Sequence, residues 1–95
     1  MVTNDDPSAL VYQALDQVLA DGTVRPGTPM AIYRAVDEMR ATFTPKAIVL
    51  KAEAVAIEIH KLGCALQRSD PHEADCARRE LKKLAAEWLD MRIRC

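Results

Sequence analysis

Residues 45–94, PKAIVLKAEAVAIEIHKLGCALQRSDPHEADCARRELKKLAAEWLDMRIR, decide the fold of this 95-residue chain. They contain two long apolar-periodic segments, at about 45–68 and 71–94, with only Ser69 and Asp70 between them. In both segments apolar residues recur at steps of three and four, the heptad spacing of helices that pack along a seam. The first seam holds Ile48, Ala52, Val55, Ile59, Leu62 and Leu66, and the second holds Ala74, Ala77, Leu81, Leu84, Trp88, Met91 and Cys95. So short a joint predicts a long antiparallel helical hairpin whose two seams face each other.

The N-terminal part of the chain predicts two shorter helices, at about 7–20 and 29–41. Each of the four segments starts where an Asp or Thr is followed by proline: Asp6-Pro7, Thr28-Pro29, Thr44-Pro45 and Asp70-Pro71. An Asp or Thr side chain at an N-cap accepts a hydrogen bond from a free amide of the first turn, and proline is favoured at the first helical position. We therefore expect one all-α domain of four helices spanning residues 1–95.

A second apolar strip lies on the helix predicted at 45–68. It consists of Leu50, Ala54, Ile57 and Cys64. A helix that is apolar on more than one side is normally buried on more than one side. We expect the two shorter helices to cover this strip, and their short length predicts that the cover is incomplete. The strip is then the interface of a homodimer, because contiguous exposed apolar surface is uncommon on monomers. The alternative is a monomeric bundle that buries the strip in its core.

Composition limits the classes of function. The formal net charge is −1 at pH 7, so the chain lacks the basic bias of a typical nucleic-acid-binding domain. No apolar run reaches the roughly 18 residues that a membrane span needs. The chain has three cysteines without the spacing of a disulfide framework. That pattern predicts reduced thiols and a cytoplasmic location.

Two His/Cys pairs resemble halves of a zinc site: His60 with Cys64, and His72 with Cys76. Helical geometry places the pairs on different sides of the predicted hairpin and at different heights, so one metal ion cannot bind all four residues. We predict no metal and no cofactor within one chain, and metal binding between two chains stays an open alternative. Neither histidine has a catalytic partner nearby in sequence, so we also predict that the protein is not an enzyme.

Two groups of residues are candidates for binding a partner protein. Tyr12, Met30 and Tyr33 fall outside the apolar stripes of their helices, and Tyr and Met are favoured as interface anchors. Arg78, Arg79, Lys82 and Lys83 form a predicted basic band on the helix at 71–94. The alternative for the band is a solvated face, because acidic residues are interleaved with it at helical pairing distance.

The loop GTVRPG at 22–27 resembles the G-x-[LV]-x-P-G turn that opens the winged-helix domain of GntR-type repressors. The resemblance covers about twenty residues and implies DNA binding, with a β-wing following the helices. Downstream the chain departs from this pattern, because the segments at 45–68 and 71–94 both have helical periodicity. The sequence as a whole therefore favours a non-enzymatic protein-binding or regulatory module of the inhibitor or adaptor kind, homodimeric, with a small DNA-binding regulator as the alternative.

Overall fold

The computed structural model describes residues 7–42 and 44–94, and for 91–94 it describes the backbone alone. Its elements are four α-helices: α1 (Pro7–Asp21), α2 (Thr28–Ala41), α3 (Lys46–Gln67) and α4 (Pro71–Arg94). No strand occurs among the described residues. The predicted all-α fold is confirmed, and each helix begins and ends within one residue of its predicted bounds.

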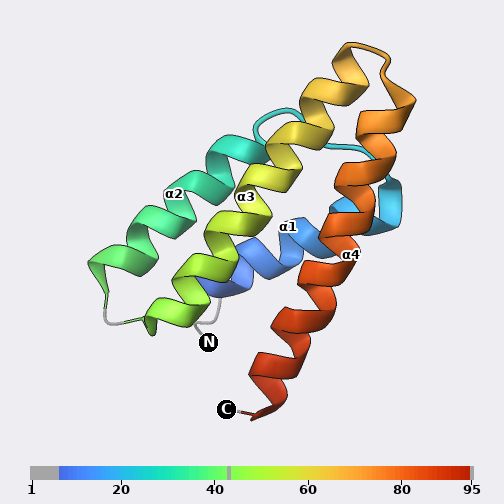
Figure 1. Ribbon diagram of the computed structural model, residues 1–95. Coiled ribbons are helices and arrows are strands. Elements are labelled where there is room, and N and C mark those ends of the chain that lie inside the picture. The colour runs from blue at the N-terminus through green and yellow to red at the C-terminus, as the bar shows by residue number, and fades with distance from the viewer. Residues whose placement is uncertain (1–6, 43, 95) are drawn as a thin grey trace.

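The helices form two layers (Figure 1). In the front layer α2, α3 and α4 lie side by side, and each runs antiparallel to the next along the chain. Helix α1 crosses behind this layer and contacts all three of its helices. No described element covers the front of the layer.

The core lies between α3 and α4 and between the front layer and α1. The predicted seams of the hairpin are buried at Ala52, Val55, Ile59 and Leu62 of α3 and at Ala74, Ala77, Leu81, Leu84 and Trp88 of α4. Two predicted seam residues, Ile48 and Leu66, are only half-buried. Val49, Ala56 and Ala65 are buried in addition, because α3 is packed on three sides rather than along one seam. Met91 and Cys95 lie outside the residues whose side chains are described.

The turn between α3 and α4 is a Schellman motif. The Ser69 N–H donates to the Leu66 carbonyl at 3.2 Å, and the Asp70 N–H donates to the Ala65 carbonyl at 2.9 Å. Ser69 takes the left-handed conformation that this motif requires, with φ of 55°. The Asp70 carboxylate then accepts from the Glu73 N–H at 3.2 Å and caps α4, as predicted.

The predicted caps of α2 and α3 are wrong. Gly27 is the N-cap of α2, with φ of 85°, and Thr28 already lies in the first turn. Pro45 is the N-cap of α3, and neither helix has a side-chain cap bond. The Thr44 hydroxyl instead lies 2.9 Å from the hydroxyl of Thr42, so it is engaged outside the helix. Asp6, the cap predicted for α1, lies outside the described residues.

The loop at 22–27 is fixed to the hairpin at two points. The Gly22 carbonyl accepts two hydrogen bonds from the Arg78 guanidinium of α4, at 3.2 and 2.8 Å. Val24 is half-buried beside Gly63 of α3, where an added Cβ would lie 3.8 Å from the valine side chain. The loop thus connects α1 to α2 across the hairpin. The β-wing implied by the likeness to GntR-type repressors is absent from the described part of the chain.

Candidate protein-binding face

The second apolar strip of α3 faces solvent. Leu50 is 54% exposed and Ile57 is 47% exposed, while Ala54 and Cys64 are half-buried. The cover of this strip by α1 and α2 is therefore incomplete, as predicted, because only Ala54 and Cys64 are partly buried. The reason is the position of the two helices: α1 crosses on the opposite side of α3, and α2 lies alongside α3 rather than over the strip (Figure 1).

Helix α2, which packs beside α3, exposes two further large apolar side chains. Tyr33 is 44% exposed and Met30 is 64% exposed. Tyr33 shares one side of α2 with Arg40, which lies two turns further along the helix. Because Arg40 binds Glu53 of α3, that side of α2 borders the solvent-facing side of α3.

We call this surface the outer face. It is defined by Met30 and Tyr33 of α2 and by Leu50, Ala54 and Ile57 of α3. The described part of the chain exposes six large hydrophobic side chains, and four of them belong to this face. The other two, Leu10 and Leu89, lie on α1 and α4. Exposed apolar residues are common when they are scattered, so it is their grouping on one face that is informative.

Ion pairs flank the apolar strip of α3, which is the centre of the outer face, on both sides. Toward α2, Arg40 binds both Glu53 and Asp37, the latter at 3.1 Å. Toward α4, the Lys51 ammonium lies 2.5 Å from the Glu87 carboxylate, and Lys61 lies 3.4 Å from Glu58. An apolar centre surrounded by a polar border is the usual anatomy of a protein–protein interface.

The charge of Glu87 is stabilised by its neighbours. The hydrogen bond from Lys51 lowers the pKa of the Glu87 carboxyl below its ordinary value. Partial desolvation raises this pKa, and the positive charges of Lys51 and Lys83 lower it further. Glu87 therefore remains ionised to lower pH than an unpaired glutamate, which preserves the link between α3 and α4.

The predicted basic band is divided by the fold. Arg78 is half-buried and binds the Gly22 carbonyl, so its guanidinium is used within the chain. Arg79 is exposed and pairs with Asp75 at 3.1 Å, and Lys82 and Lys83 are exposed. Whether these three residues bind a partner stays a prediction.

Tyr12 lies apart from the other candidate binding residues. It is half-buried and packs against the core from α1, behind the front layer. It therefore does not contribute to the outer face, and of the three predicted anchors only Met30 and Tyr33 are exposed on α2, the helix next to the strip of α3.

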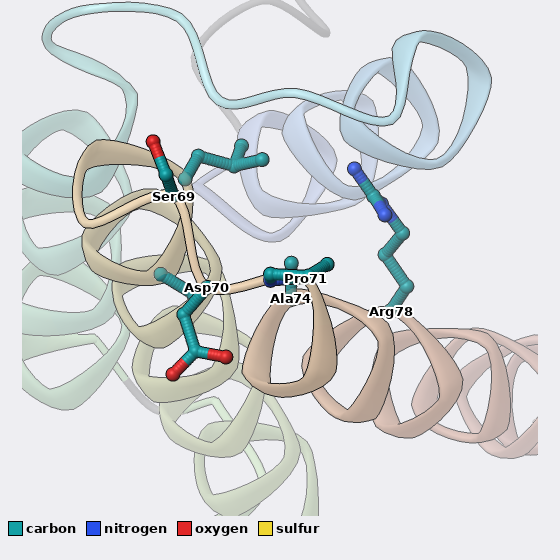
Figure 2. Close-up of a pocket in the computed structure, with 7 residues that line it drawn as sticks. Ser69, Asp70, Pro71, Ala74 and Arg78 are labelled. Atoms are coloured by element: carbon teal, nitrogen blue, oxygen red, sulfur yellow. The ribbon is translucent and has the colours of Figure 1, made fainter.

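The hollow drawn in Figure 2 has a volume of about 240 Å³ and is open to solvent. It is lined by Ala65, Leu66, Ser69, Asp70, Pro71, Ala74 and Arg78. Its polar side chains, Ser69, Asp70 and Arg78, point in different directions. Catalysis and small-molecule binding need polar groups that converge on one point, and this hollow does not provide that arrangement.

Each His/Cys pair forms a contact within its own helix. His60 Nε2 lies 3.6 Å from Cys64 Sγ, and His72 Nε2 lies 4.0 Å from Cys76 Sγ. Among the described residues, no group of three or more His, Cys, Asp and Glu side chains is placed to hold a metal ion. Each pair offers at most two ligands to a metal, fewer than the three or four protein ligands of zinc sites.

Comparisons with protein-family models, curated proteins and solved structures found no match to this chain. Within the described residues, none of the helices has the length and apolar character needed to cross a bilayer. The functional interpretation therefore depends on the geometry of the outer face.

Proposed function

We propose that this chain is a non-enzymatic protein-binding module, regulatory in the manner of a small inhibitor or adaptor, which acts as a homodimer through its outer face. The observation that carries the proposal is the exposure of Met30 and Tyr33 on α2 and of Leu50 and Ile57 on α3, two neighbouring helices of the layer whose front no described element covers (Figure 1). Burying such a patch against another protein removes apolar area from water, at about 25 cal/mol per Å².

The chemistry of the surface supports protein binding over the alternative of DNA binding. A DNA-binding surface presents Lys and Arg side chains that can neutralise phosphates. Around the outer face, Arg40, Lys51 and Lys61 are each paired with a carboxylate. Four acidic residues share this border, so it has no net positive field to attract a phosphate backbone.

The proposal is tested by measuring molar mass in solution by sedimentation equilibrium with a reducing agent present. We expect twice the chain mass of 10.6 kDa for the natural sequence. Ile57→Asp should give the mass of one chain, because it would bury an unpaired charge at the centre of the interface. Leu89→Asp is the matched control, since Leu89 is 48% exposed but lies on α4 away from the outer face.

Circular dichroism of the variants separates loss of binding from loss of fold. Both substitutions change an exposed side chain, so we expect the helix content of both variants to equal that of the natural protein. A natural protein with the mass of one chain at every concentration would contradict the homodimer. Equal disruption by Leu89→Asp would contradict the assignment of the interface to the outer face.

A further inference from the structure

We infer that the second copy packs its α3 antiparallel against α3 of the first, with the two-fold axis at the level of the peptide bond between Val55 and Ala56. The inference rests on the proposed function and specifies how the partner binds. The solvent-facing side of α3 carries Ala47, Leu50, Ala54, Ile57, Lys61 and Cys64, which alternate steps of three and four residues. This is the spacing of a helix that packs along one seam against another helix.

The proposed register places small side chains opposite large ones. Ile57 of each copy packs against Ala54 of the other, on both sides of the axis. Ala47 lies opposite Cys64 of the second copy, and Leu50 lies against the aliphatic part of Lys61. Small residues let the helices approach closely, and the long lysine side chain covers Leu50 while its ammonium stays at the solvent-exposed edge beside Glu58.

The charges that border the strip are complementary in this register. On the side of α4, Lys51 lies opposite Glu58 of the second copy. On the side of α2, Glu53 lies opposite His60 of the second copy, and a histidine ring can donate a hydrogen bond to a carboxylate. The two-fold symmetry repeats each pair, so four favourable contacts border the apolar centre.

Every neighbouring arrangement of the same strip brings like charges together. If the axis moves one step along the strip toward the N-terminus of α3, Lys51 of one copy lies opposite Lys51 of the other. Glu53 then also lies opposite Glu53. If the axis moves one step toward the C-terminus, Glu58 lies opposite Glu58 of the second copy, and His60 lies opposite His60. In a parallel pair, Lys51 would lie opposite Lys46 of the second copy, and Glu58 would lie opposite Glu53. The charge pattern therefore favours one orientation and one register, which is how border charges specify helix pairing.

The pairs within one chain are compatible with this arrangement. Glu53 binds Arg40 through one carboxylate oxygen, which leaves the other oxygen for His60 of the second copy. Lys51 binds Glu87, and its ammonium has two further donors. None of the described elements covers the front of the helical layer, so a second layer can approach it face to face (Figure 1).

Substitutions of His60 test the border contacts, because His60 is exposed and its ring lies 3.6 Å from Cys64 Sγ of its own helix rather than in an ion pair with a carboxylate. His60→Glu would bring two new pairs of like charges together, and we expect the dissociation constant of the dimer to rise roughly tenfold. His60→Lys should leave it unchanged or lower it. The control is His72→Glu, which changes an exposed histidine with the same i, i+4 cysteine neighbour but lies on α4. Equal weakening by His60→Glu and His72→Glu would overturn the assigned contact.

Cross-linking tests the register itself. In a protein with Cys76→Ser and Cys95→Ser, we add Ala47→Cys, treat the dimer with a short bis-maleimide and map the linked peptides by mass spectrometry. We expect a product between residues 47 and 64 of different copies. Without Ala47→Cys we expect no covalent dimer, because the register separates the two copies of Cys64 by about 25 Å along the helix axis.

The two tests distinguish failure of the register from failure of the proposed function. A dimer that links Cys64 to Cys64 is parallel or shifted, and it would overturn the register while leaving binding through the outer face intact. A natural protein that sediments as one chain would overturn both self-association and the register. The product between residues 47 and 64, together with the effect of His60→Glu, would establish the proposed arrangement.

Discussion

Ser69 is a non-glycine residue in the left-handed conformation, with φ of 55°. This conformation costs an L-residue about 1–2 kcal/mol, and glycine avoids that steric cost. Glycine in turn loses about 0.5–1 kcal/mol more conformational entropy on folding, so only part of the gain remains. We therefore expect Ser69→Gly to raise the free energy of unfolding by about 0.5–1 kcal/mol, measured by urea denaturation. Ser69→Val should lower it, because branching at Cβ worsens the steric clash. A glycine variant less stable than the natural protein would contradict the Schellman turn.

Trp88 is the largest side chain of the core and is 3% exposed. Its replacement by alanine leaves a cavity in the core beside α4, so we expect Trp88→Ala to lower the free energy of unfolding by about 3–5 kcal/mol. Leu89→Ala, at the next position of the same helix, should cost less than about 1 kcal/mol because Leu89 is half-exposed. Similar losses for the two variants would contradict the orientation of α4.

At the scale of elements, the ion pair of Lys51 with Glu87 links α3 to α4 and makes stability depend on pH. Because the pKa of Glu87 is lower in the folded protein than in the unfolded chain, the unfolded chain binds more protons near that pKa. The stabilisation is present above the unfolded pKa and is lost as pH falls through the folded pKa. We expect the stability difference between the natural protein and Glu87→Gln to shrink over this acid range in urea titrations. A difference that does not change with pH would contradict the pair.

The helices could be predicted from the sequence because apolar periodicity and Asp/Thr-Pro pairs are local signals. The N-cap of α2 could not be predicted, since Gly27 and Thr28 both suit this position. The choice between them depends on the conformation of the loop, which tertiary contacts fix. The exposure of Leu50 and Ile57 could be predicted only in part. The short neighbouring helices indicated incomplete cover, but which strip residues stay exposed depends on which side of α3 is crossed by α1. The role of Arg78 could not be predicted either, because its hydrogen-bond partner Gly22 is 56 residues away in sequence.

At the scale of the whole molecule, the described residues form a three-helix layer with one side covered by α1 and the other side covered by none of the described elements (Figure 1). A domain of this size buries a modest core, so covering the open side with a second layer should contribute measurably to stability.

This gives a prediction about the melting temperature. If association buries the outer face, mass action stabilises the folded dimer, so the melting temperature of the natural protein should rise with protein concentration. Ile57→Asp should melt at a temperature independent of concentration, because the variant folds without a partner. Leu89→Asp should keep the concentration dependence of the natural protein, since its substitution lies outside the outer face. Thermal melts followed by circular dichroism over a wide range of concentrations measure this effect. A natural protein with a constant melting temperature would mean that the layer is stable while open, and that folding does not depend on the second copy.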